Sequence, residues 1–267
     1  MTIISQNSSN TSIAVVCFSN LRRQQTKDFC LRNGYPLINK KDKQYELLLL
    51  LHDDLIELYD SQLNTTISID FLKGSLAHRH RFGGGRGQAI AKAVGLKSAI
   101  TPTVLDTTAG LAGDAFVLAT LGCPITLIER SPILFCLLEN ALERATLNET
   151  FQPITRQGFH IMQCDANDYI KEQRVKKQTA PDVIYIDPMY PDRKKSALVK
   201  KDMQILQRLH GKDDNTDELL DNALSFAKKR VVVKRPAYAG PLNDRKPDTS
   251  IKSKKTRYDI YTIEKML

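Results

Sequence analysis

Residues 103–130 read TVLDTTAGLAGDAFVLATLGCPITLIER, and this stretch decides the fold class. A short apolar strand is expected at its start, followed by a small-residue loop over 106–113 and a helix over 114–121. A second strand is expected over 125–128, with Glu129 at its tip. A strand, a glycine loop, a helix and a second strand make a βαβ unit, which belongs in a parallel sheet. The stretch therefore predicts an α/β fold with a ligand site at its first crossover.

Acidic residues around the loop indicate which ligand it holds. Gly110 and Gly113 let the backbone approach a ligand and expose amide donors. Glu129 lies 23 positions after Asp106, near the spacing at which an acidic residue takes the ribose hydroxyls of an adenosine. The βαβ unit therefore predicts an adenosine-containing cofactor held by these four residues.

The same loop discriminates between adenosine cofactors. A dinucleotide fingerprint reads G-x-G-x-x-G, but residues 109–114 read AGLAGD, without the first glycine and with Asp114 near the helix start. A carboxylate repels a pyrophosphate, whereas S-adenosylmethionine carries a sulfonium and an ammonium. Asp106 and Asp114 thus favour S-adenosylmethionine. Asp114 can also be a first-turn acid that serves the helix dipole, and both roles can hold together.

A second decisive stretch, residues 182–191, reads DVIYIDPMYP. Its apolar, β-branched part predicts a strand buried on both faces, and its polar end falls where open α/β sheets bind ligands. Asp187 and the carbonyl of Pro188 can both accept hydrogen bonds from one exocyclic NH₂ group. Tyr190 offers a flat face on which a base can stack. Taken alone, the turn could be an ordinary Asp-Pro turn; together with the glycine loop it indicates a site for a planar amine.

These motifs resemble the class I S-adenosylmethionine-dependent methyltransferases and, more narrowly, the RsmJ family. The resemblance extends from about Arg81 to Pro241, and residues 1–70 match only loosely. One departure is Ala112-Gly113 before Asp114, where the family usually has Gly-Arg. The runs that carry the resemblance are 81–88 (RFGGGRGQ), 105–111 (LDTTAGL), 187–191 (DPMYP), 194–201 (KKSALVKK) and 231–236 (VVVKRP).

The resemblance implies a fold, an activity and a set of contacts. The expected fold is a Rossmann-like, mostly parallel α/β sheet with an antiparallel last strand. The expected activity is transfer of a methyl group from S-adenosylmethionine to the N2 amine of a guanine (guanine 1516 in that family) in bacterial 16S ribosomal RNA. The cofactor contacts that it implies are Gly113, Asp114, Glu129, Arg130, Asp165, Ala166 and Asp187.

Asp165 has two interpretations that the residues leave open. Residues 159–162 predict a third strand, and Asp165 follows its end, where an acid can accept a hydrogen bond from the adenine amino group. The same position suits the N-cap of a helix that begins near Asn167.

Composition and patterning predict one enzyme-sized body with a small addition. The chain has 267 residues, of which 42% are hydrophobic, enough for a substantial core. We expect an N-terminal α+β appendage over 1–72 and the methyltransferase domain over 73–267. Strands are expected at 13–18, 45–51, 55–59, 65–71 and 231–234, helices at 21–32, 89–94 and 216–227, and a terminal hairpin at 250–263.

The sequence argues against several other classes of protein. It contains neither an apolar run near 18 residues nor an N-terminal basic segment followed by an apolar one, so we expect a cytoplasmic protein without a membrane span. Its five cysteines form no C-x-x-C pair and have no histidine at metal spacing. They predict reduced core thiols and no metal site.

The net charge of +9 and the pI near 9.2 fit a polyanionic partner. Any single basic run is commonly just a solvated surface, but several runs here flank the two motifs. We therefore expect an RNA groove at the ligand edge of the sheet. The predicted RNA contacts are Arg81, Arg86, Arg193, Lys194, Lys195, Lys200, Lys234 and Arg235.

The sequence thus predicts a methyltransferase that acts on 16S rRNA or the small ribosomal subunit, with Asp187, Pro188 and Tyr190 at its catalytic centre. A flipped or unpaired guanine is held there for in-line methyl transfer. Two alternatives stay open: a methyltransferase for another planar amine (adenine N6 or a protein amide), and a non-catalytic basic RNA-binding protein with a relict cofactor fold. The glycine pattern disfavours an NAD-dependent oxidoreductase.

Overall fold

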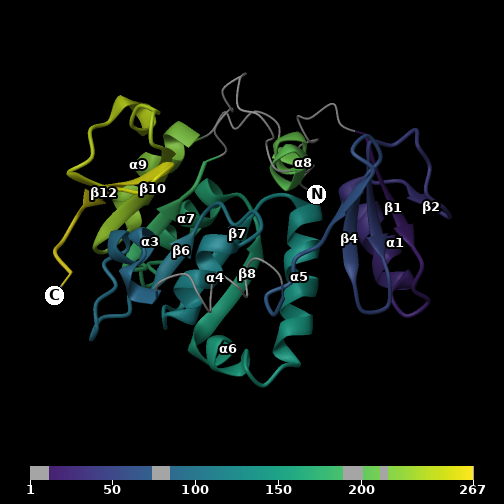
Figure 1. Ribbon diagram of the computed structural model, residues 1–267, viewed down its shortest axis with the longest axis horizontal. Coiled ribbons are helices and arrows are strands. Elements are labelled where there is room, and N and C mark those ends of the chain that lie inside the picture. The colour runs from purple at the N-terminus through teal and green to yellow at the C-terminus, as the bar shows by residue number, and fades with distance from the viewer. Residues whose placement is uncertain (1–11, 74–84, 189–200, 211–215, 267) are drawn as a thin grey trace. The chain divides into compact units, whose positions relative to one another are not determined.

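The computed structural model describes residues 12–73, 85–188, 201–210 and 216–266 (Figure 1). The chain divides into two compact units. The first comprises Met1–Asp70, Ser131–Arg144 and Asp192–Lys212, and the second comprises Phe71–Arg130, Ala145–Pro191 and Asp213–Leu267. The first break falls close to the predicted boundary after residue 72. The grouping of two later segments with the N-terminal unit was not predicted.

The first unit contains a five-stranded sheet in the order β2-β1-β3-β4-β5. β1 is parallel to β2 and β3, and the β3-β4-β5 ladder is antiparallel. The helix α1 (Arg23–Asn33) connects β1 to β2, which makes this unit the expected mixture of helix and strands. The strands are β1 (Ile13–Cys17), β2 (Leu37–Ile38), β3 (Leu47–Leu51), β4 (Ile56–Asp60) and β5 (Thr65–Ile67).

Two later helices, α5 (Pro132–Thr146) and α8 (Lys201–His210), belong wholly or almost wholly to the first unit. The side chain of Asn140 in α5 accepts from the amide of Ile56 (3.0 Å) and donates to the carbonyl of Asp54 (3.2 Å). Because these bonds satisfy backbone groups at the start of β4, they join α5 to a sheet more than 80 residues earlier in the chain.

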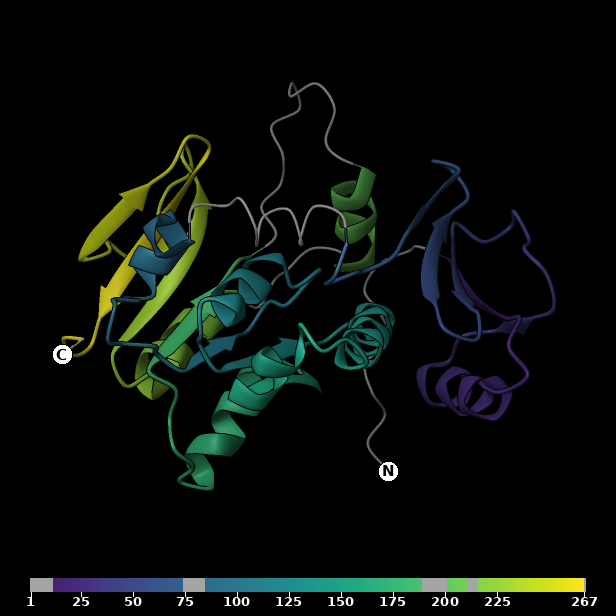
Figure 2. The same ribbon diagram turned by 60° about the horizontal axis from the view of Figure 1, so that its bottom comes forward.

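The second unit contains a seven-stranded sheet in the order β11-β12-β10-β9-β6-β7-β8 (Figures 1 and 2). β8, β7, β6, β9 and β10 are parallel, and β12 and β11 close the sheet as antiparallel strands. This confirms the predicted mostly parallel sheet with an antiparallel last strand. The strands are β6 (Val104–Asp106), β7 (Ile125–Glu129), β8 (Phe159–Gln163), β9 (Val183–Ile186), β10 (Arg230–Pro236), β11 (Thr249–Lys252) and β12 (Thr256–Thr262).

Helices cover both faces of this sheet. On one face, α7 (Ala166–Val175) and α9 (Thr216–Phe226) pack on alternate residues of the strands, such as Ile184 and Ile186, in one buried cluster. On the other face, α4 (Gly113–Thr120) presents Phe116 to a group of stacked rings that includes Phe71 and Phe151. The short helices α3 (Ala89–Ala93) and α6 (Gln152–Gly158) contact α4. Burial on both faces explains why the strands are almost continuously apolar.

The order of the strands sets the position of the ligand edge. β6 pairs with β7 on one side and with β9 on the other, because the chain runs outward from β6 through β7 to β8 and then crosses back to form β9. Ligands of open α/β sheets bind beyond the carboxyl ends of the strands at such a switch point. The fold therefore brings the ends of β6, β7 and β9 together at the expected site.

Candidate active site at the carboxyl edge of the sheet

Carboxylates follow three neighbouring strands at this edge. Asp106 ends β6, Glu129 ends β7, and Asp187 directly follows β9. Asp114 joins them from the first turn of α4. Asp106, Asp114 and Glu129 are buried, with 3%, 9% and 2% of their surface exposed. The site is therefore acidic and largely withdrawn from water.

The glycine loop is held over Glu129. The amide of Gly110 donates to Oε2 of Glu129 at 3.0 Å. Gly110 has φ +54°, which favours glycine, while a Cβ built on it would meet nothing closer than 3.9 Å. Glycine is thus required by the backbone conformation and not by crowding. Ala112 at the N-cap of α4 is also left-handed, with φ 55°, and such strain in a non-glycine residue is commonly found at functional sites.

An ion network links the cofactor loop to the Asp-Pro turn. Nζ of Lys234 lies 2.9 Å from Oδ2 of Asp114 and 2.8 Å from Oδ2 of Asp187. The hydroxyl of Tyr185 donates to the same oxygen of Asp114 at 2.6 Å. Burial alone would lower the pKa of Lys234, but Asp187 and Asp114 more than offset it and raise that pKa. Burial and then Asp114 raise the pKa of Tyr185. Lys234 therefore stays an ammonium and Tyr185 a neutral donor.

Asp106 is linked to Asp187 through Thr108. Oδ1 of Asp106 accepts from the amide of Thr108 at 3.0 Å, and Oγ1 of Thr108 accepts from the amide of Asp187 at 2.7 Å. Burial raises the pKa of Asp106 from 3.8 to about 7; the Thr108 amide opposes this shift, and the carboxylates of Asp187 and Asp114 add to it. Asp106 therefore titrates near neutral pH.

The predicted cofactor residues beyond this network lie along the same edge. Asp165 follows β8 and is the N-cap of α7, because its side chain accepts from the amides of Asn167 (2.8 Å) and Asp168 (3.3 Å). Ala166 begins α7, and Arg130 follows Glu129 as an exposed side chain. The capping interpretation of Asp165 is thus what the structure shows, and a contact with adenine stays a prediction.

Three of the predicted RNA contacts have side chains placed differently from the expectation. Lys234 takes part in the ion network, and Arg235 is 5% exposed and donates to the carbonyl of Gly240 (3.0 Å). Arg86 donates to the carbonyls of Lys97 and Leu121. Since Leu121 follows α4, which runs back from the ligand edge, Arg86 lies at the opposite edge. All three side chains thus have partners within the protein, and a contact of any of them with RNA stays a prediction.

The remaining predicted site residues lie outside the described residues. They are Tyr190, Arg81, Arg193, Lys194, Lys195 and Lys200. Pro188 is described and is buried directly after Asp187. The roles of Tyr185 and Thr108 were not predicted from the sequence. A signal for Tyr185 was available, because a hydroxyl within an apolar strand needs a buried partner.

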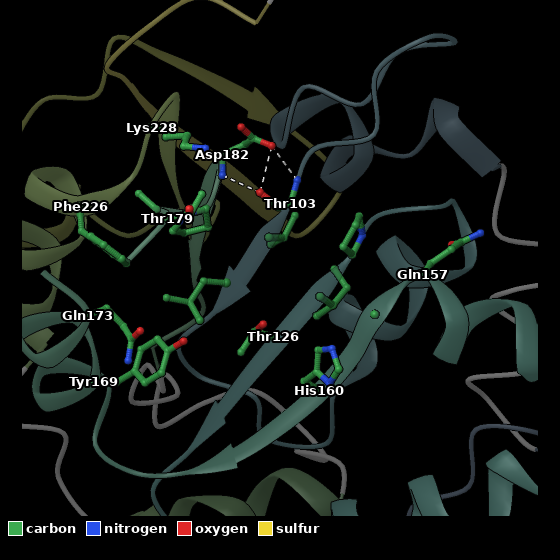
Figure 3. Close-up of a pocket in the computed structure, with 17 residues that line it drawn as sticks. Thr103, Thr126, Gln157, His160, Tyr169, Gln173, Thr179, Asp182, Phe226 and Lys228 are labelled. Atoms are coloured by element: carbon green, nitrogen blue, oxygen red, sulfur yellow. Dashed lines mark hydrogen bonds between the residues drawn. The ribbon is translucent and has the colours of Figure 1, made fainter. Parts of the chain in front are cut away.

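A pocket of about 360 Å³ lies at the other end of the strands (Figure 3). Its lining includes Thr103 before β6, Ile125 at the start of β7 and Asp182 before β9. Asp182 accepts from the amide and hydroxyl of Thr103 at 2.9 and 3.0 Å, as Figure 3 shows. This pocket is therefore separate from the carboxylates and contributes nothing to their chemistry.

The acidic side chains at the carboxyl edge fit S-adenosylmethionine. Three acidic side chains, Asp106, Asp114 and Asp187, interact with the ammonium of Lys234. A fourth, Glu129, accepts from the Gly110 amide. Such a set attracts a cationic ligand with hydroxyl groups and repels a pyrophosphate. No group of three or more metal-binding side chains occurs among the described residues, and no described helix is long and apolar enough to cross a membrane.

Comparisons with known proteins agree with this geometry. The family described as "Putative SAM-dependent methyltransferase" matches residues 31–263. Two curated relatives are both called ribosomal RNA small subunit methyltransferase J. The protein from Colwellia psychrerythraea is 49% identical over 230 residues, with 85% of this chain and 82% of the relative covered. The protein from Psychromonas ingrahamii is 44% identical over 254 residues, with 95% and 97% covered.

A solved structure has the same fold over almost the whole chain. The crystal structure of a SAM-dependent methyltransferase from Neisseria gonorrhoeae matches with a TM-score of 0.72 and 31% sequence identity. The match covers 93% of this chain and 95% of that one. The match therefore includes both units of the chain.

Proposed function

We propose, from the premise that this chain belongs to the ribosomal RNA small subunit methyltransferase J family of S-adenosylmethionine-dependent methyltransferases, that it methylates the N2 amine of a guanine in small-subunit ribosomal RNA. The observation that carries the proposal is the junction between the cofactor loop and the Asp-Pro turn. Lys234 and Thr108 join Asp187 to Asp114 and Asp106 within hydrogen-bond distance. These contacts support a site in which Asp187, the proposed partner of the amine, lies next to the proposed cofactor residues.

Asp187 is the residue that we assign to the acceptor amine. Its backbone is fixed by Thr108, and its Oδ2 is fixed by Lys234. Held in this way, the carboxylate accepts a hydrogen bond from the N2 amine, and the carbonyl of Pro188 is the second acceptor. Two acceptors on one NH₂ group set the direction of the nitrogen lone pair, which is the main requirement for in-line transfer.

S-adenosylmethionine supplies the methyl group on a positively charged sulfur. The N–C bond forms as the C–S bond breaks, the bonding electrons of C–S pass to sulfur, and the nitrogen loses one proton. Asp187 is placed to accept that proton or to pass it to water. Because the amine attacks as a neutral group, a strong base is not needed, and positioning contributes up to roughly 7–11 kcal/mol.

Glu129 and the glycine loop are the residues that we assign to the cofactor. The Gly110 amide orients Glu129 at the tip of β7, where an acid takes ribose hydroxyls. Asp114, and Asp106 in its ionised form, attract the positive charge of the ligand. Asp165, Ala166 and Arg130 lie farther along the edge and complete the proposed contacts.

The test is to incubate the protein with methyl-labelled S-adenosylmethionine and three separate pools: small subunits from cells that lack this methyltransferase, DNA, and protein. We expect label in the ribosomal RNA of the subunits. Label in DNA or protein would favour another planar amine, and binding of RNA without any label would favour a relict cofactor fold. Naked 16S rRNA as a fourth pool shows whether the enzyme needs the assembled subunit.

A further inference from the structure

We propose that single-stranded RNA docks on an aromatic and basic surface beside the active site, which we call the Tyr238 surface. It consists of Tyr238, in the loop after β10, and of Lys252, Lys254 and Lys255 around the β11–β12 turn. The proposal rests on the proposed function for the choice of RNA as partner. The docking proposal goes beyond the proposed function because it names where the RNA binds. Lys234 and Arg235, which were predicted to contact RNA, instead have partners inside the protein.

Strand register places this surface at the carboxyl edge. Val233 pairs with Ile186, the last residue of β9 before Asp187. β10 continues three residues farther, and Pro236 at its end pairs with Thr256 at the start of β12. The loop after β10 and the turn before β12 therefore extend beyond the edge at which Asp187 lies, on the side of β10.

The loop that carries Tyr238 is fixed by backbone hydrogen bonds. The amide of Ala237 donates to the carbonyl of Lys255 (3.1 Å), and the amide of Ala239 donates to the carbonyl of Pro236 (3.0 Å). Nε of Arg235 donates to the carbonyl of Gly240 at 3.0 Å. A loop held on both sides of an aromatic residue presents its ring with little loss of conformational entropy on binding.

The ion pair between Arg257 and the buried Asp259 also supports this loop. Arg257 binds both carboxylate oxygens of Asp259, at 2.8 and 3.0 Å, while its NH1 group donates to the carbonyl of Ala239. Asp259 is fully buried. Arg235 and Arg257 thus bind the backbone of the loop. The lysines of the Tyr238 surface are exposed and can bind phosphates.

The exposed groups of this surface have the chemistry of a single-strand RNA site. Tyr238 is 49% exposed as a residue, while its neighbour Ala239 is 5% exposed. Lys252, Lys254 and Lys255 are exposed, and the turn that carries them is closed by the bond from the amide of Ser253 to the carbonyl of Thr256 (2.7 Å). Bases stack on exposed aromatic rings, and clustered ammonium groups neutralise phosphates.

The experiment measures binding of a fluorescein-labelled, unstructured 20-nucleotide RNA of mixed sequence to full-length variants. We expect Tyr238→Ala to weaken binding roughly tenfold, as loss of one stacked base does, and Tyr238→Phe to restore it. In the triple variant K252Q/K254Q/K255Q, the slope of log affinity against log salt concentration should become shallower by about 2, at ~0.7 per phosphate contact. Calorimetry with S-adenosylmethionine should show unchanged cofactor affinity in every variant.

The matched control removes the same charge from the amino ends of the strands. Lys97, Lys177 and Lys228 are exposed there, and K97Q/K177Q/K228Q should leave the salt slope within 0.5 units or so of the wild-type value, since ions that far from the RNA are screened. Wild-type affinity and slope in both Tyr238→Ala and the turn variant would overturn the proposal. RNA binding that depends on the surface, together with a wild-type protein that transfers no methyl group, would instead refute the proposed function and leave the docking site standing.

Discussion

Replacement of Asp106 by Asn should remove a large pH dependence from the stability of this protein. Asp106 is 3% exposed, and its pKa is raised from 3.8 to about 7, chiefly by burial and also by Asp187 and Asp114. Each pKa unit corresponds to about 1.4 kcal/mol. A difference of about 3 units therefore corresponds to about 4 kcal/mol of folding free energy that depends on the protonation of one carboxyl group.

The sign of the effect follows from which state holds the proton. The unfolded chain loses the Asp106 proton near pH 3.8, whereas the folded protein keeps it until about pH 7. The stabilising contribution is therefore complete below pH 3.8 and is lost as pH rises through 7. About 3 kcal/mol of this contribution to the free energy of unfolding is lost between pH 5 and pH 8. The reason is that about two pH units of this range lie below the pKa of Asp106 in the folded protein.

Urea unfolding of the wild type and of Asp106→Asn, repeated at several pH values from 5 to 8, measures this contribution. Subtracting the two free energies of unfolding cancels the groups that titrate alike in both proteins. We expect the wild type to lose about 3 kcal/mol relative to the variant across the window. A constant difference, or a wild type that gains stability with pH, would show that Asp106 is already ionised in the folded protein at pH 5 and that burial does not raise its pKa.

Three further predictions concern the other carboxylates and their lysine. Asp187→Asn should lower the rate of methyl transfer at least ~100-fold while calorimetry still detects cofactor binding; a variant with full activity would remove Asp187 from the mechanism. Glu129→Gln should weaken S-adenosylmethionine binding roughly tenfold and leave RNA affinity unchanged, and equal cofactor affinity in both proteins would contradict the ribose assignment. Lys234→Met makes the site more negative, so the ratio of the dissociation constants of S-adenosylhomocysteine and S-adenosylmethionine should rise several-fold. A ratio that stays constant while both affinities fall would mean that Lys234 only maintains the fold.

The parts of the site that could be predicted from sequence are those fixed by local patterns. Glu129 and Asp187 follow short apolar runs, and a residue at the end of a buried parallel strand must lie at the ligand edge. Gly110 follows from the need for a left-handed backbone between strand and helix. These predictions needed only the period of the strands and the direction of the chain.

The parts that could not be predicted depend on side-chain direction and on distant neighbours. Lys234 and Arg235 form part of a basic run in the sequence, but successive residues of a strand point to opposite faces. Each of the two side chains has a different partner inside the fold. The pairing of Lys234 with Asp114, 120 residues away, requires knowing that β9 and β10 are neighbours. Asn140, which ties α5 to β4, is equally invisible to local patterns.

If the Asp187 turn presents a guanine N2 amine to the methyl donor, nucleoside analysis of the product will identify the methylated atom. Small-subunit RNA methylated in vitro by the wild type and by Asp187→Asn is digested, and the labelled nucleoside is identified by mass spectrometry. We expect N2-methylguanosine from the wild type and almost none from the variant. Label in N6-methyladenosine, or equal yields of N2-methylguanosine from both proteins, would contradict this expectation.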